Sequence, residues 1–255
     1  MSSFTPPLLA VAHGSRDPRA AATVEALLSE VRARRPERRV GTAYLDHAPP
    51  TVGQAVSALD ADGIDDVAVL PLLLTAAYHS KTDIPGALTQ AQRKHPRMRF
   101  RYGDTLGPHP QLTAALERRL IDTGVCVGDP ETAVVLAAAG SADDSSNATI
   151  AEIARGWHRR GWWGVVPAYA SAAAPTPADA VASLRAAGAP RVVVASYFLA
   201  PGFFADKVRQ AALDAGADVV SDVLGAAPEV AEVVIERYGA ASSSSPAWTP
   251  ASRTA

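Results

Sequence analysis

Two histidines and one carboxylate near the start of the chain have the chemistry of a metal site. Each of them follows a short apolar run, and the three residues are His13, Asp46 and His79. Neutral imidazole is the commonest side-chain ligand of divalent transition metals, and a nearby carboxylate can supply a third donor or accept a proton. These residue types predict an open metal site with a base beside it.

Short apolar runs alternate with longer segments of helical period in the first half of the chain. The expected strands are 8–12, 40–45, 67–72 and 98–102, and the expected helices are 18–35, 51–61, 82–94 and 110–123. The strand runs are almost continuously apolar, which is typical of parallel strands covered by helices on both faces. Because ligands bind beyond the carboxyl ends of such strands, we expect His13, Asp46 and His79 to converge on one edge of the sheet.

The second half repeats this alternation. Its expected strands are 133–138, 165–169, 191–196 and 217–220, and its expected helices are 145–160, 176–187, 203–215 and 228–238. The pattern Asp-x-Leu-Gly-x-x-Pro occurs at 104–110 and again at 222–228, so turn and helix-start residues recur at identical spacing. The fold class predicted is therefore α/β, with two similar doubly wound parallel-sheet domains related by internal duplication.

The predicted division of the 255 residues has three parts. An N-terminal α/β domain that carries the metal ligands spans 1–126, and a degenerate C-terminal repeat spans 127–238. Gly, Asp and Pro break the pattern between them. A serine-rich tail, 239–255, has too little apolar content to pack and is expected to be disordered.

The second repeat keeps the turn of the first repeat and loses its candidate ligands. In the alignment of the two halves, Ala139 stands at the position of His13, Ser171 at that of Asp46 and Phe204 at that of His79. Gly14 and Gly140 are retained, as a tight strand-to-helix turn requires. The fold therefore does not need the histidines, which favours a functional role for His13 and His79.

The other histidines are expected outside the site. His47 should point to the opposite face from Asp46, because side chains alternate along a strand. Neighbouring prolines or arginines favour a surface position for His95, His109 and His158.

Positive groups border the predicted metal site. Ser15, Arg16 and the amides that open the first helix form a corner suited to anions, because a helix N-terminus carries partial positive charge. Lys81 lies two residues past His79. A metal site with these neighbours suits a substrate that carries several carboxylates.

Composition excludes several classes of protein. The net charge of −2 argues against a nucleic-acid protein that depends on an excess of Lys and Arg. No apolar run reaches the roughly 20 residues that span a bilayer, and the N-terminus lacks a signal-peptide pattern, so we expect a cytoplasmic chain without a membrane partner. The single cysteine, Cys126, excludes an internal disulfide framework and a Cys-rich cluster.

Three ordered motifs resemble those of the class II chelatases, specifically the sirohydrochlorin chelatases. They are Leu9-Ala-Val-Ala-His-Gly-Ser-Arg-Asp-Pro18, Tyr44-Leu-Asp46 followed by Pro50-Thr51, and Pro71-Leu-Leu-Leu74 with Tyr78-His-x-Lys-x-Asp-Ile-Pro85. The resemblance spans nearly all of 8–238 in the two-repeat form of the family. It implies insertion of Fe²⁺ or Co²⁺ into sirohydrochlorin on the way to sirohaem or cobalamin, with the divalent metal as substrate and no organic cofactor.

The resemblance also implies roles for individual residues. His13 and His79 correspond to the histidines that bind the incoming metal. Asp46 stands where the family usually has Glu, and two roles stay open for it: metal ligand, or base alone. The flat ring is expected in the cleft between the halves, with Tyr78, Phe203 and Phe204 as walls. Basic groups such as Arg16 and Lys81 would meet the ring carboxylates.

Several alternatives stay open at this point. The chain could bind metal or a tetrapyrrole without turnover, since Asp replaces the usual Glu and the ligands lie in one half. It could also be a chelatase for a different tetrapyrrole. A monomer that carries both repeats could form one asymmetric site, and a homodimer is equally compatible with the sequence.

Overall fold

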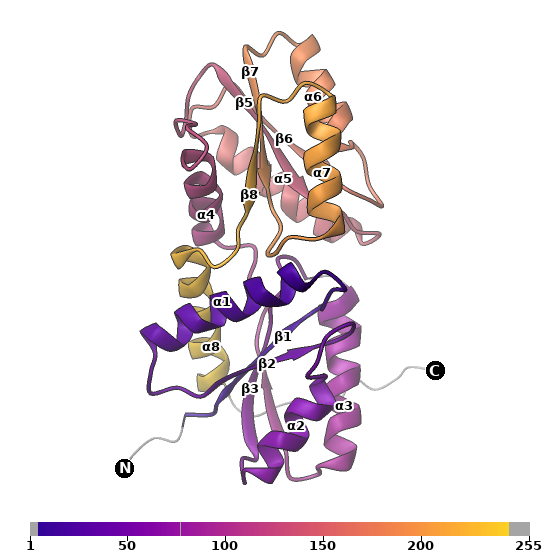
Figure 1. The fold of residues 1–255 in the computed structure, drawn as a ribbon, viewed down its shortest axis with the longest axis vertical. Helices are drawn as coiled ribbons and strands as arrows, with labels where there is room; N and C mark the ends of the chain where they lie inside the picture. The colour runs from indigo at the N-terminus through magenta and orange to yellow at the C-terminus, as the bar shows by residue number, and fades with distance from the viewer. Residues whose placement is uncertain (1–4, 77, 245–255) are drawn as a thin grey trace. The chain divides into compact units, whose positions relative to one another are not determined.

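The computed structural model describes residues 5–76 and 78–244, and the side chain of His79 lies outside that description. The chain divides into two compact units. Among the described residues, the first unit contains those up to 107 and those from 231 onward, and the second contains 108–230. Each unit is built around one four-stranded parallel sheet with helices on both faces, so the predicted fold class is confirmed (Figure 1).

The first unit has the strand order β2-β1-β3-β4. Its strands are β1 (Leu8–Ala12), β2 (Val40–Tyr44), β3 (Asp66–Pro71) and β4 (Arg99–Tyr102). Its helices are α1 (Pro18–Arg34), α2 (Val52–Ala61), the short π-helix η1 (His79–Asp83), α3 (Ile84–Lys94) and most of α8 (Pro228–Ser243). Apolar side chains of β1 to β4 pack with α2 and α3 in one buried cluster, whose members include Val11, Val56, Leu88 and Phe100.

The second unit has the equivalent order β6-β5-β7-β8. Its strands are β5 (Thr132–Ala138), β6 (Gly164–Tyr169), β7 (Arg191–Ser196) and β8 (Val219–Val223). Its helices are α4 (Pro110–Ile121), α5 (Asp144–His158), α6 (Pro177–Ala186) and α7 (Phe203–Asp214). A core cluster joins the four strands to α6 and α7, and includes Val135, Val181, Val194 and Val208.

The two units repeat the same local devices. Thr51 and Thr176 each cap the helix that follows the second strand of their unit, and each forms a capping box with the third helical residue. A capping box satisfies two backbone N–H groups at the start of a helix. The agreement extends to helix length, since α2 and α6 run over equivalent positions, as duplication predicts.

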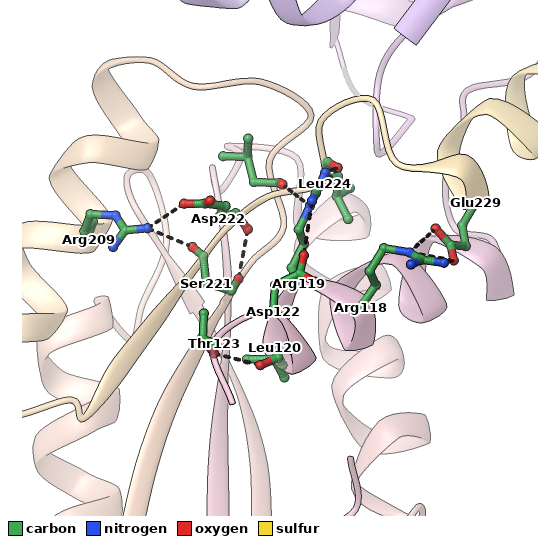
Figure 2. A network of polar contacts seen from close by, with 11 residues as sticks. Arg118, Arg119, Leu120, Asp122, Thr123, Arg209, Ser221, Asp222, Leu224 and Glu229 are labelled. Atoms are coloured by element: carbon green, nitrogen blue, oxygen red, sulfur yellow. Dashed lines mark hydrogen bonds and ion pairs between the residues drawn. The ribbon is translucent and has the colours of Figure 1, made fainter. Parts of the chain in front are cut away.

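The position of helix α4 disagrees with the predicted domain boundary between residues 126 and 127. It packs on β7 and β8 and so belongs to the second unit, although its sequence follows the last strand of the first repeat. Figure 2 shows the polar contacts: Arg119 donates to the Leu224 carbonyl oxygen at 2.8 Å, and Arg118 is paired with Glu229 at 2.6 Å. The hydrogen bonds between Arg118 and Glu229 keep both side chains charged, because they raise the pKa of Arg118 and lower the pKa of Glu229.

Helix α8 corrects the expectation for the C-terminal tail. We predicted disorder from residue 239, but α8 continues to Ser243, and its residues from 231 onward belong to the first unit. The Tyr238 hydroxyl donates to the Pro6 carbonyl oxygen at 2.7 Å, and Arg34 of α1 is paired with Glu232. Contacts with Pro6 and with α1 therefore hold α8 in the first unit, and the helix extends into a segment whose composition alone favours disorder. The remainder of the predicted tail, 245–255, lies outside the described residues.

A largely buried ion pair anchors the end of α8. Arg101 of β4 is paired with Asp66 of β3 at 2.7 Å, and the two side chains are 18% and 7% exposed. The same guanidinium donates to the carbonyl oxygens of Ser242 and Ser244 at 2.9 and 2.6 Å. Carbonyl groups at a helix C-terminus lack intrahelical donors, so Arg101 satisfies them while it neutralises Asp66.

We expect Arg101→Met to lower the free energy of unfolding by about 3–5 kcal/mol, because it leaves the Asp66 carboxylate buried without its partner. Arg99→Met is the matched control on the same strand, since the Arg99–Asp65 pair is more than half exposed and removing it should cost about 1 kcal/mol or less. Urea denaturation of both variants checks the difference. Equal losses would contradict an anchoring role for Arg101.

Candidate functional site

The backbone brings His13 and Asp46 together at the carboxyl ends of β1 and β2. These strands pair in parallel up to Ala12 and Tyr44. The ladder then continues past the strand ends, with the amide of Leu45 donating to the Ala12 carbonyl oxygen and the amide of Asp46 donating to the His13 carbonyl oxygen, both at 3.0 Å. The side chains of His13 and Asp46 are both exposed, so a ligand from solution can reach them.

Gly14 is required by this close approach. Its φ is +91°, and a Cβ built on it would lie 1.8 Å from the Asp46 carbonyl oxygen. Gly140 occupies the equivalent place in the second unit, with φ +80° and a Cβ that would lie 2.0 Å from the Ser171 carbonyl oxygen. The predicted need for glycine in the turn is confirmed, and its cause is contact with the loop after the neighbouring strand.

The Asp46 carboxylate interacts with His47, which differs from the expectation for His47. Asp46 Oδ1 accepts a hydrogen bond from the His47 amide at 2.7 Å, and Oδ2 lies 3.3 Å from His47 Nε2. The strand ends at Tyr44, and His47 has a φ of +63°, so the alternation of a strand no longer governs its direction. Ala172 has a φ of +58° at the equivalent position, so the turn itself belongs to both repeats.

The segment that carries His79 is a short π-helix rather than a loop. η1 begins at His79 and runs directly into α3. Tyr102 of β4 donates its hydroxyl to the Ser80 carbonyl oxygen at 2.7 Å. Burial raises the pKa of Tyr102, so the phenol stays protonated and remains a donor at neutral pH. A core residue therefore fixes the backbone next to His79, and π-helical turns occur frequently at functional sites.

An open cleft of about 550 Å³ joins these elements within the first unit. His13 and Asp46 line it together with residues of η1 and α3, among them Thr82, Asp83 and Gln90. Asp83 is a second carboxylate in this cleft that we did not predict as a site residue. Its position four residues after His79 in a helical segment was the available signal, because such spacing brings residues to one side of a helix.

Polar groups at the corner formed by Ser15 and Arg16 already have hydrogen-bond partners within the chain, which we did not predict. The Ser15 hydroxyl oxygen accepts from the Asp17 amide at 3.0 Å, and the Asp17 carboxylate accepts from the Arg19 amide at 2.9 Å. Hydrogen bonds from Arg19 hold the pKa of Asp17 below its usual value, so the N-terminus of α1 already has its own anion. Arg16 is exposed beside this turn.

The remaining predicted residues are exposed, but they belong to different units. Tyr78 is 64% exposed and precedes η1 directly, and Lys81 lies within η1. Phe203 and Phe204 begin α7 in the second unit, where they are 75% and 41% exposed. Their rings meet edge to face, with centroids 5.5 Å apart. Exposed aromatic side chains of this kind offer an apolar surface to a ligand.

No group of three or more His, Cys, Asp or Glu residues stands ready to hold a metal ion in the part of the chain that the structure describes. The side chain of His79 lies outside that part, so the predicted pairing of His13 with His79 stays a prediction.

Within residues 5–76 and 78–244, no helix is both long enough and apolar enough to cross a membrane.

The family model CbiX matches residues 7–123 and 133–241 of the chain. The sirohydrochlorin cobaltochelatase of Priestia megaterium is 31% identical over 208 residues, which is 80% of this chain and 67% of that protein. The sirohydrochlorin ferrochelatase of the same organism is 26% identical and covers 86% of this chain and 84% of its own length. Both halves of the sequence are therefore matched.

Solved structures have the same fold. SirB from Bacillus subtilis with Fe³⁺ superposes with a TM-score of 0.81 and 23% identity, covering 94% of this chain and 96% of that one. CbiX, described as the terminal enzyme for the biosynthesis of sirohaem in denitrifying bacteria, gives a TM-score of 0.67 and 22% identity, covering 92% and 98%. The two-sheet architecture is thus shared over nearly the whole chain.

We expect Gly14→Ala to destabilise the protein by about 1–3 kcal/mol, because the residue has positive φ and the new methyl group meets backbone of the Asp46 loop. Gly156→Ala in α5 is the control, since a Cβ there meets nothing within 4 Å and alanine favours a helix by up to about 1 kcal/mol. Thermal or urea unfolding measures both. A neutral Gly14→Ala would refute the close approach.

Tyr102→Phe should loosen η1 while leaving the rest of the fold intact. Loss of the hydrogen bond to Ser80 corresponds to about 1 kcal/mol, so amide hydrogen exchange in residues 79–83 should accelerate several-fold. Tyr169→Phe is the control, because its hydroxyl donates to the Asn147 carbonyl oxygen in the second unit. Unchanged exchange at 79–83 in Tyr102→Phe would argue against this anchor.

Proposed function

This chain belongs to the CbiX family, and on that premise we propose that it inserts a divalent metal ion, Fe²⁺ or Co²⁺, into sirohydrochlorin. The observation that carries the proposal is a single cleft lined by His13 and Asp46 at the carboxyl edge of the first sheet. The names of the Priestia megaterium relatives support both the tetrapyrrole substrate and the two metals.

The reaction requires a weakly held metal and a nearby base. The macrocycle loses two pyrrole N–H protons as four nitrogens take the metal, while the metal sheds its water. In our proposal His13 and His79 hold the incoming ion, and few ligands suffice because a tightly caged metal could not leave. N and O donors of this type accept both Fe²⁺ and Co²⁺, so availability decides which metal is used.

The proton acceptor in this proposal is Asp46. Its carboxylate is exposed in the cleft and is hydrogen-bonded to the amide of His47, so its orientation is fixed before the ring arrives. Asp83 lines the same cleft and offers a second carboxylate for the second proton. Two acceptors match the two protons that each turnover releases.

Ring binding is assigned to the exposed residues already described. We propose that Tyr78, Phe203 and Phe204 contact the flat macrocycle. Arg16 and Lys81 would pair with its carboxylates, and the Ser15 hydroxyl group would donate a hydrogen bond to one of them. In this proposal the first unit supplies the metal ligands, and the second unit is the degenerate repeat, which lacks them. Absence of an organic cofactor, cytoplasmic location and a monomeric or homodimeric state remain predictions.

Purified protein should accelerate insertion of Co²⁺ or Fe²⁺ into sirohydrochlorin, followed by the absorbance change of the ring. His13→Ala and His79→Ala should each abolish most of the rate, because each removes one metal ligand. Asp46→Asn should lower the rate while metal binding is retained, because the amide keeps the shape and loses the base. His158→Ala, at the exposed end of α5, is the control.

The outcomes of this assay separate the alternatives. Wild-type rates in both histidine variants would overturn the assignment of the metal ligands. Stoichiometric metal binding without acceleration would favour a binding protein, and preference for another macrocycle in the same assay would favour a different tetrapyrrole.

A further inference from the structure

A second hollow of the first unit lies between α2 and α3. Its volume is about 580 Å³, and it is lined by Ser57 and Gln54 of α2 and by Lys94 and His95 at the end of α3. Apolar side chains, including Ala87 and Ala91, complete its wall. None of these polar residues has a role in the function proposed above.

Two side chains of this groove, Ser57 and His95, form a chain of hydrogen bonds that ends at Asp60. Ser57 Oγ lies 2.9 Å from His95 Nε2, and His95 Nδ1 lies 2.9 Å from Asp60 Oδ2. The order hydroxyl, imidazole, carboxylate is that of Ser-His-Asp hydrolases, which are recognised by geometry rather than by sequence order. Ser57 is exposed, while the side chains of His95 and Asp60 are 19% and 27% exposed.

The carboxylate sets the tautomer of the imidazole. Asp60 Oδ2 accepts a hydrogen bond from Nδ1–H, so Nε2 of the neutral ring is left as an acceptor for a hydrogen bond from the Ser57 hydroxyl group. The Ser57 hydroxyl also lies 2.9 Å from the Gly53 carbonyl oxygen, which is a second acceptor for the same proton. Rotation about the Cβ–Oγ bond therefore exchanges a resting and an activated hydroxyl.

The fold does not require this chain of hydrogen bonds. Helix α6 repeats the length and the capping box of α2, yet it has Ala182 and Arg185 where α2 has Ser57 and Asp60. The residue directly after α7 is Ala215, whereas His95 directly follows α3. The second unit thus builds the same two helices without any of the three groups.

We propose that Ser57, His95 and Asp60 form a second catalytic site, which hydrolyses carboxylic esters with a short acyl group. Ser57 Oγ attacks the carbonyl carbon as its proton passes to His95 Nε2. The bond to the leaving alcohol breaks, and the alcohol takes that proton. Water then gives a proton to His95 and attacks the acyl-serine, which releases the carboxylic acid and restores the Ser57 hydroxyl.

Donors for the developing oxyanion line the same groove. The Gln54 side-chain oxygen accepts from the Thr51 amide, which leaves its NH₂ group as the donor, and Lys94 supplies a positive charge. Ala87 and Ala91 give the acyl group an apolar wall. The groove, at about 580 Å³, has room for a small ester.

The full chain should therefore hydrolyse p-nitrophenyl acetate and react with a fluorophosphonate probe. Intact mass should show one phosphonyl adduct, and peptide mass spectrometry should locate it at Ser57. Ser57→Ala should lose the adduct and reduce hydrolysis to the buffer rate, and His95→Gln and Asp60→Asn should lose most of both.

Ser29→Ala is the matched control, because Ser29 is an exposed serine of helix α1 whose hydroxyl lies 3.4 Å from Arg32. It should keep the wild-type adduct and rate. Thermal unfolding of every variant verifies that it is folded. A wild-type chain without an adduct, an adduct on another residue, or a Ser57→Ala variant with the wild-type rate would overturn the proposal and leave the three groups as a link between α2 and α3.

Discussion

The contact between Gly14 and the carbonyl of Asp46 is the constraint on which the candidate site depends. It allows the β1–β2 ladder to continue past the strand ends, so positions 13 and 46 are neighbours through main-chain hydrogen bonds. Gly140 and Ser171 repeat the contact in the second unit. Because the backbone alone makes this arrangement, the side chains at these positions are free to vary, and only the first unit has His and Asp there. Fold and chemistry are separable at this edge of each sheet.

Much of this architecture follows from local sequence. All sixteen segments that we expected as strands and helices are present, because a buried parallel strand and an amphipathic helix each depend mainly on their own pattern of apolar residues. The π-helix at His79 was missed, since it depends on Tyr102 from another strand. The direction of His47 was also missed, because a left-handed residue ended the alternation that we assumed. The assignment of α4 and α8 to their sheets could not be read from sequence, because an apolar helix face does not specify which sheet it covers.

Arginine carries much of the polar organisation of both units. Arg101 satisfies the end of α8 and neutralises a buried carboxylate, and Arg119 satisfies the carbonyl groups that follow β8 (Figure 2). Both use the planar guanidinium to serve several acceptors at once, which a lysine could not do with the same geometry. These two arginines thus attach helices to sheets. At the candidate site, by contrast, the side chains of His13 and Asp46 are exposed, as the proposed transfer of a metal ion to a substrate from solution requires.

The discontinuous composition of the first unit has a consequence for how the protein is made. Residues up to 107 are synthesised before the second unit, but their unit also contains residues from 231 onward, which are synthesised after it. The second unit is one continuous segment, 108–230, and every part of it has left the ribosome before the first unit can be completed. During translation Arg101 and Asp66 are therefore present before α8, whose Ser242 carbonyl oxygen accepts a hydrogen bond from Arg101. The first unit can therefore complete its fold only after the second unit has been synthesised.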